Sequence, residues 1–201
     1  MFTGLIESVG RIDAVTPSAS GSTLRIATAL AADLALGDSV AVNGVCLTVT
    51  ATDDGAMAAD VGPETARVTT LGAVRPGRTV NLERSMRADS RFGAHFVQGH
   101  VDGTGTLTAR RQDGESHWLT IAYPRALRPY LVPKGSIAVD GISLTVAQLR
   151  EHDFDVMIIP FTWAHTNLSS LAMHDAVNLE GDMIGKYVAR AVDVFRGGVG
   201  G

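Results

Sequence analysis

Short apolar runs alternate with polar turns along the whole chain. Val, Ile and Thr are frequent within the runs, and clusters of Gly, Asp, Pro and Ser separate them, which is typical of β-strands joined by turns. The runs recur roughly every ten residues, a spacing typical of a small antiparallel barrel or sandwich. The predicted strands are 24–28, 39–42, 46–50 and 79–82 in the first half, and 118–122, 136–139, 143–147, 154–159 and 176–179 in the second.

Two dipeptides, Asn43-Gly44 and Asp140-Gly141, stand between consecutive strand runs. Asn-Gly and Asp-Gly pairs favour the tight turns of β-hairpins, so each pair predicts a hairpin. Segments 29–36 and 124–131 occupy matching places in the two halves, and we expect each to form a single helical turn.

The pattern becomes helical near the end of the chain. Apolar residues recur there at helical spacing while basic residues fall on other faces, which predicts an amphipathic helix over 183–196. The glycine-rich residues 197–201 are expected to form a mobile tail. The apolar positions are Ile184, Tyr187, Val188, Ala191 and Phe195, and the basic ones are Lys186, Arg190 and Arg196.

The two halves of the chain repeat each other. Residues 43–49 (NGVCLTV) read closely against residues 140–146 (DGISLTV), 97 positions further on, and an offset of 95 relates Gly4 to Gly99. One loop that differs by two residues explains the change of offset. Because identities recur in order over nearly a whole half, the chain is duplicated. We expect the repeats to span 1–94 and 95–191.

Composition restricts the class of protein. With 201 residues, 45% of them hydrophobic, and a net charge of −4, the chain has the apolar content of a globular protein and no basic run for nucleic acid. The single cysteine excludes a disulfide framework and favours a reducing, cytoplasmic location. No apolar stretch is long enough to span a membrane, and the first residues do not resemble a signal peptide. The six histidines lack metal-ligand spacing, so no metal is expected.

The aligned repeats differ at positions that can carry chemistry. Cys46 corresponds to Ser143, and each is followed two positions later by a threonine, Thr48 or Thr145. A thiol and a hydroxyl at equivalent places could act on equivalent ligands. The alternative is structural, with Cys46 as a small buried hydrophobic residue and Ser143 as an ordinary strand residue.

Two further polar residues are candidates. His100 stands where the first repeat has Leu5, and an imidazole with a pKa of about 6.5 can move protons at neutral pH; a structural histidine is equally compatible with the pattern. Lys134 precedes a predicted strand and could meet a polar ligand, or it could be an ordinary solvated lysine.

Four motifs resemble the riboflavin synthase family. They are residues 1–7 (MFTGLIE), 43–50 (NGVCLTVT), 93–103 (GAHFVQGHVDG) and 140–146 (DGISLTV), and the resemblance extends over both repeats and the terminal helix. It implies an all-β fold of two homologous six-stranded antiparallel Greek-key barrels followed by a C-terminal α-helix. It also implies a homotrimer held by that helix, with possible association with lumazine synthase.

The resemblance implies an activity as well. In this family two molecules of 6,7-dimethyl-8-ribityllumazine exchange a four-carbon unit to give riboflavin and 5-amino-6-ribitylaminouracil, without metal or organic cofactor. Each active site takes both molecules, one on the first barrel of one subunit and one on the second barrel of a neighbour. Two homologous pockets suit two identical substrates, and holding them face to face can supply up to roughly 7–11 kcal/mol of the barrier.

Carried over residue by residue, the resemblance assigns acid–base and polarising roles to His100, Cys46 and Ser143, with Thr48 and Thr145 orienting the rings. The expected substrate contacts begin with Gly4, Leu5, Ile6, Cys46, Leu47, Thr48, Asp60, Val61, Gly62, Pro63, Glu64, Thr65, Gly99, His100 and Val101. In the second barrel they are Lys134, Ser143, Leu144, Thr145, Met157, Ile158, Ile159, Pro160, Phe161 and Thr162.

Two other classes of protein share this barrel. A non-catalytic lumazine or flavin carrier shares the duplicated barrel but tends to lose the polar positions that Cys46, His100 and Ser143 keep here. The flavin-binding barrel of a reductase needs an attached nucleotide domain, and only nine residues follow Val192.

Overall fold

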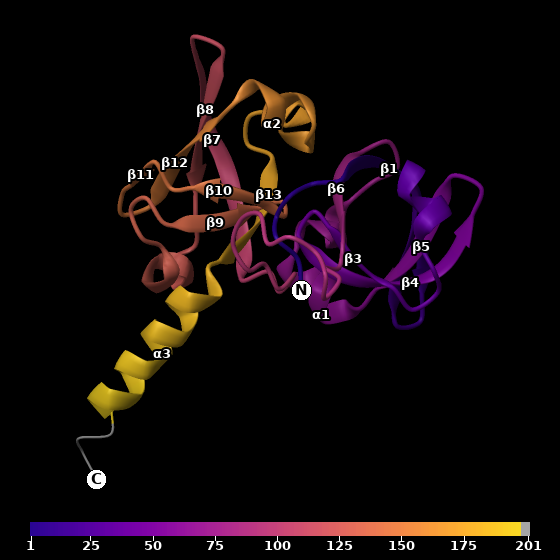
Figure 1. The fold of residues 1–201 in the computed structure, drawn as a ribbon, viewed down its shortest axis with the longest axis horizontal. Coiled ribbons are helices and arrows are strands. Elements are labelled where there is room, and N and C mark those ends of the chain that lie inside the picture. Colours follow the sequence, from indigo (N-terminus) through magenta and orange to yellow (C-terminus); the bar gives the residue numbers. More distant parts are fainter. Residues whose placement is uncertain (198–201) are drawn as a thin grey trace.

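Strands form most of both halves of the chain, and Figure 1 shows two barrel-like units side by side with a helix projecting from the second. The computed structural model describes residues 1–197. Within that range no helix combines the length and the apolar character needed to cross a bilayer. The expected mobile tail falls on residues 198–201, outside the described residues, apart from Gly197, which closes the terminal helix.

The first repeat is a closed, antiparallel six-stranded barrel with strand order β1-β2-β5-β4-β3-β6. In it β3, β4 and β5 are successive neighbours and β6 returns beside β3, which is Greek-key connectivity. Short helical turns η1, α1 and η2 connect the strands. The elements are β1 (Ser8–Ser18), β2 (Gly21–Ala27), η1 (Ala29–Asp33), β3 (Ser39–Val42), β4 (Val45–Asp53), β5 (Ala56–Val61), α1 (Pro63–Val68), η2 (Thr70–Ala73) and β6 (Thr79–Arg84).

The second repeat has the same design with one strand divided. Its sheet runs β10-β9-β13-β7-β8-β12-β11, and its two ends, β10 and β11, together correspond to β4. The Ala147 N–H donates to the Asp155 carbonyl at 2.8 Å, which holds the divided strand against β12. The elements are β7 (Gly103–Asp113), β8 (Ser116–Ala122), η3 (Arg125–Tyr130), β9 (Ser136–Val139), β10 (Ile142–Thr145), β11 (Gln148–Leu149), β12 (Asp153–Ile158), α2 (Pro160–Ala164), η4 (Asn167–Ser170) and β13 (Ala176–Gly181).

The expected all-β fold of two barrels and a terminal helix is confirmed, with corrections to single elements. The run 143–147 does not stay in one strand, because the chain leaves the sheet after Thr145. The run 154–159 ends at Ile158, because Pro160 starts α2 and cannot continue a ladder. The segments expected as helical turns contain η1 and η3, each a short 3-10 helix.

Each barrel has its own apolar core, and a third small cluster joins them. Inward side chains such as Leu24 in the first barrel and Phe154 in the second are fully buried. Between the barrels, Phe2 and Val97 pack with Ala41 and Ala138, and Cys46 lies partly buried against this cluster. The two barrels therefore share a packed junction.

The terminal helix α3 (Met183–Gly197) confirms the prediction over 183–196. It packs on η3 and then extends away from the barrels (Figure 1). Its apolar side chains are exposed, with 61% for Ile184, 67% for Tyr187 and 77% for Phe195. Its apolar stripe therefore does not face the chain's own barrels.

Candidate functional site

The leading segment of each repeat crosses to the barrel of the other repeat. The Cys46 N–H on β4 donates to the Gly99 carbonyl at 2.9 Å, and the Ser143 N–H on β10 donates to the Gly4 carbonyl at 2.9 Å. Between these contacts Phe2 and Val97 form an antiparallel bridge. Each candidate site thus combines a strand of one repeat with the start of the other.

Close backbone approach explains the glycines in these segments. Gly4 and Gly99 have φ of +75° and +79°, in the left-handed region that favours glycine. A Cβ on Gly99 would lie 2.6 Å from the Cys46 Cβ, and one on Gly4 would lie 2.6 Å from the Ser143 nitrogen. Any side chain would push the segment off the strand.

Two buried carboxylates anchor the crossing segments. Glu83 accepts hydrogen bonds from the Thr3 N–H at 2.7 Å, the Thr3 hydroxyl at 2.8 Å and the Gly4 N–H at 2.9 Å. Its counterpart Glu180 accepts from the N–H groups of residues 98, 99 and 100 at 2.7, 3.0 and 2.9 Å. Burial raises the pKa of both carboxyl groups, that of Glu180 to about 7.

A buried polar network joins the two hairpin turns across the junction. The Asn81 N–H donates to Asn43 Oδ1 at 2.7 Å, and the equivalent Asn178 N–H donates to Asp140 Oδ1 at 2.8 Å. The two amide side chains then cross over to the opposite turn, at 3.0 Å to the Asp140 carbonyl and 2.8 Å to the Asn43 carbonyl. Asn167 closes the network with a 2.8 Å bond to Asp140 Oδ2. These bonds fix the relative position of the barrels.

The first candidate site lies on the outer face of the first barrel. The side chains of Cys46 and Thr48 point outward from β4, and that of Asp60 points outward from β5. The two strands are neighbours, because Val49 pairs with Ala59. The crossing segment adds His100, which is exposed. The predicted contact residues gathered here are Cys46, Leu47, Thr48, Asp60, Val61, Gly62, Pro63, Glu64, Thr65, Gly99, His100 and Val101.

The second candidate site lies at the equivalent place on the second barrel. Ser143 and Thr145 point outward from β10, while Met157, Ile159 and Phe161 are exposed on β12 and α2. The predicted contact residues on this barrel, or on the segment that crosses to it, are Gly4, Leu5, Ile6, Lys134, Ser143, Leu144, Thr145, Met157, Ile158, Ile159, Pro160, Phe161 and Thr162. The sequence predicts Gly4, Leu5 and Ile6 as contacts of the first barrel. In the structure the Gly4 carbonyl accepts the Ser143 N–H, and Ile6 packs on the core of the second barrel.

Four of the predicted contact residues point inward. Leu47, Val61, Leu144 and Ile158 are buried in the barrel cores, because side chains alternate between the two faces of a strand. They can reach a ligand on the outer face only through their backbone. The prediction of contiguous segments did not separate them from their outward neighbours.

His95 is a site residue that the sequence did not identify. Its Nδ1 lies 2.6 Å from the Ser143 hydroxyl oxygen, and burial lowers the pKa of the imidazole, which favours its neutral form. A neutral imidazole bonded to a hydroxyl is an arrangement that can polarise or deprotonate that hydroxyl. All six histidines lie at or after position 95, so the first repeat has no histidine that aligns with His95, and a comparison of the repeats could not reveal the pair.

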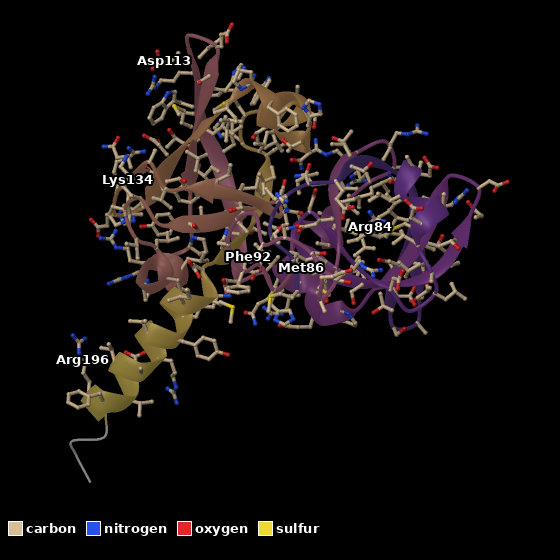
Figure 2. All side chains as sticks on the ribbon, in the orientation of Figure 1. Arg84, Met86, Phe92, Asp113, Lys134 and Arg196 are labelled. Atoms are coloured by element: carbon tan, nitrogen blue, oxygen red, sulfur yellow. The ribbon has the colours of Figure 1, made fainter. Side chains whose placement is uncertain are left out.

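Lys134 occupies a turn before β9 with φ of +66°, where the first repeat has Gly37 at +89°. Figure 2 places it on the side of the second barrel that faces away from the first. Within residues 1–197 no hydrogen bond joins Cys46 or His100 to Ser143. Of the five residues given catalytic roles, Cys46 and Thr48 lie on β4, Ser143 and Thr145 lie on β10, and His100 lies on the segment that crosses to β4.

The class of protein follows from the fold, the two equivalent sites and a match to the lumazine binding domain at residues 3–85 and again at 98–182. It is a protein with duplicated lumazine-binding barrels. Riboflavin synthase from Actinobacillus pleuropneumoniae is 46% identical over 189 residues, which cover 94% of this chain and 88% of the relative. Riboflavin synthase from Mycobacterium tuberculosis is 46% identical over 197 residues, covering 94% of this chain and 97% of the relative. The chain belongs to the riboflavin synthase family.

Solved structures share the fold at lower identity. LumP complexed with riboflavin matches with a TM-score of 0.85 and 21% identity, covering 90% of this chain and 99% of that one. LumP complexed with 6,7-dimethyl-8-(1'-D-ribityl) lumazine matches with a TM-score of 0.82 over 90% and 98%. These matches support the duplicated barrel fold.

Proposed function

We propose that this protein is the transferase that converts two molecules of 6,7-dimethyl-8-ribityllumazine into riboflavin and 5-amino-6-ribitylaminouracil. The observation that carries this proposal is a pair of equivalent outer-face sites whose reactive positions differ. Cys46 with His100 marks the first site, whereas Ser143 with Leu5 marks the second. Two identical substrates can therefore bind alike and react unequally, one as donor and one as acceptor of the four-carbon unit.

The residues divide the chemistry between the two sites. The reaction needs a proton moved at the C7 methyl group of one ring and a nucleophile added at C7 of the other. His100 is the proposed proton-transfer group of the first site, with Cys46 beside it, and Ser143 is polarised by His95 at 2.6 Å in the second. Thr48 and Thr145, which point outward beside them, orient the rings.

A homotrimer with sites between subunits is part of the proposal. The predicted contact residues Met157, Ile159 and Phe161 are 47%, 51% and 68% exposed, and α3 presents an apolar stripe to solvent. Exposed apolar surface of this kind is typical of protein interfaces and ligand sites. A neighbour's first barrel facing this surface would enclose two substrates. A cytoplasmic location and association with lumazine synthase are further parts of the proposal.

One assay tests the activity. Purified protein is incubated with 6,7-dimethyl-8-ribityllumazine, and riboflavin is followed by its absorbance. We expect riboflavin from the wild type, and a loss of turnover in His100→Ala that far exceeds any loss of lumazine affinity. We also expect Cys46→Ser to lower activity; unchanged activity would leave Cys46 with a packing role. Tight lumazine binding without riboflavin would favour the carrier.

Subunit mixing tests the shared site. His100→Ala disables the first-barrel half of each site, and Ser143→Ala disables the second-barrel half. If sites form between subunits, mixed trimers contain some interfaces with both halves intact, so mixing two weakly active variants should restore activity. No recovery after demonstrated subunit exchange would mean that each chain works alone.

A further inference from the structure

The segment that carries His100 is tied to the terminal helix by an ion pair. Lys186 Nζ on α3 lies 2.7 Å from Asp102 Oδ2, and the two side chains are only 22% and 21% exposed. The same carboxylate oxygen accepts the Gly181 N–H at 2.8 Å. The pair is therefore mostly shielded, and it connects α3 to the residue two positions after His100.

In the first repeat a strand residue, and not a helix residue, pairs with the equivalent carboxylate. Glu7, the counterpart of Asp102, accepts the Arg84 N–H at 2.7 Å and the Arg84 Nε–H at 2.8 Å. Arg84 corresponds to Gly181, which has no side chain to offer a charge. A Cβ at Gly181 would lie 2.8 Å from the Tyr130 Cβ in η3. In the second repeat the cation has thus moved from the strand to α3.

Residues 98–102 are fixed to β13 at both ends. Glu180 holds the N–H groups of residues 98, 99 and 100, and the Asp102 N–H donates to the Leu179 carbonyl at 2.9 Å. Lys186 acts on both carboxyl groups that hold this segment, Asp102 and Glu180. Burial and the charge of Asp102 raise the pKa of Glu180, and the charge of Lys186 opposes that rise. His100 is the last of the three residues bonded to Glu180, and it lies two positions before Asp102.

We propose that Lys186 is a positioning residue for His100, so that docking of α3 on its own barrel sets the geometry of the first candidate site. The ion pair holds Asp102, and Asp102 and Glu180 hold the segment. His100 follows Gly99, whose carbonyl accepts the Cys46 N–H at 2.9 Å, so the position of the segment sets the position of His100 relative to β4. This inference rests on the proposed function for the role of His100. In this proposal α3 acts on a site of its own chain, in addition to any contact with a neighbouring subunit.

A substitution cycle tests the coupling. Lys186→Met keeps the length of the side chain and removes the charge, so kcat for riboflavin formation should fall by about tenfold or more with a much smaller change in KM, because a misplaced catalytic group lowers the rate more than binding. Lys186→Arg should keep most of the activity. In a His100→Ala background, Lys186→Met should cause little further loss. Wild-type kcat in Lys186→Met, or an equal loss in both backgrounds, would overturn the proposal.

A second measurement does not depend on activity. Amide hydrogen exchange over residues 98–102 should be faster in Lys186→Met than in the wild type and in Lys186→Arg. Arg84→Met is the matched control, because it removes the equivalent cation of the first repeat and should change exchange around Glu7 and not at 98–102. Unchanged exchange at 98–102 in Lys186→Met would refute the coupling even if riboflavin forms. If the wild type makes no riboflavin, faster exchange still supports the coupling and only the proposed function fails.

Discussion

Lys134 illustrates at the scale of one residue how a site can be kept at a cost in stability. The residue adopts φ of +66° where the first repeat uses Gly37, and a side chain in this left-handed region costs roughly 1–2 kcal/mol. For Lys134 the proposed compensation for this strain is contact with the substrate.

Lys134→Gly should therefore stabilise the fold and weaken lumazine binding. Relief of the backbone strain should raise the free energy of unfolding. Glycine gains more freedom in the unfolded chain, which offsets part of this gain, so we expect a net rise of about 0.5–1 kcal/mol. His174→Gly is the matched control, because His174 has φ of +71° opposite Gly77 and belongs to neither candidate site. It should gain similar stability in urea titration without changing the affinity measured by lumazine fluorescence. Equal affinity in both variants would leave Lys134 as a surface residue.

At the scale of elements, the crossing segments decide where the sites lie. Gly99→Ala should detach residues 98–102 from β4, because its Cβ would lie 2.6 Å from the Cys46 Cβ. We expect a loss of about 2–4 kcal/mol in the free energy of unfolding, from overpacking and left-handed strain together.

Gly37→Ala separates these two causes. Gly37 has φ of +89°, but nothing lies within 4 Å of a Cβ built there. Its substitution should cost only the strain, about 1 kcal/mol. Thermal unfolding of both variants measures the difference, and equal destabilisation would show that the contact with Cys46 is not tight in solution.

The elements also differ in how well their sequences predict them. Runs such as 39–42 and 136–139 coincide with β3 and β9 because their β-branched residues directly precede the hairpin signals Asn43-Gly44 and Asp140-Gly141. Four strands were not predicted. β5 is rich in alanine, β1 is largely polar, and β7 carries glycines and charges, so local propensity is weak in each, and β11 has only two residues. Their pairing partners supply the structure. The crossing contacts at Gly4 and Gly99 are non-local, so no run of residues could have predicted them.

At the scale of the whole molecule, a duplicated polar junction holds the two barrels together. Asn81 and Asn178 are matched between the repeats, but Thr70 in the first corresponds to Asn167 in the second, and Asn43 corresponds to Asp140. The sequence marked this pair as hairpin turns, whereas their joint burial with Asn167 appears only when both repeats are folded. The carboxyl group of Asp140 is thus enclosed between the barrels, where the charge of Arg78 lowers its pKa and that of Asp175 raises it.

That enclosed carboxyl predicts how stability depends on pH. Burial raises the pKa of Asp140 from 3.8 to about 6, so the folded protein binds this proton more tightly than the unfolded chain. The stabilisation is complete below about pH 3.8 and is lost as the pH rises through about 6; the difference corresponds to about 3 kcal/mol.

The free energy of unfolding of the wild type, compared with Asp140→Asn, should therefore fall by about 2–3 kcal/mol between pH 4 and 7 in urea titrations. Asn43→Asp, which places a second carboxyl at the equivalent turn, should steepen the dependence. Parallel curves for the wild type and Asp140→Asn would mean that Asp140 stays ionised in the junction, with its charge satisfied by the bonds from Asn167 and Asn178.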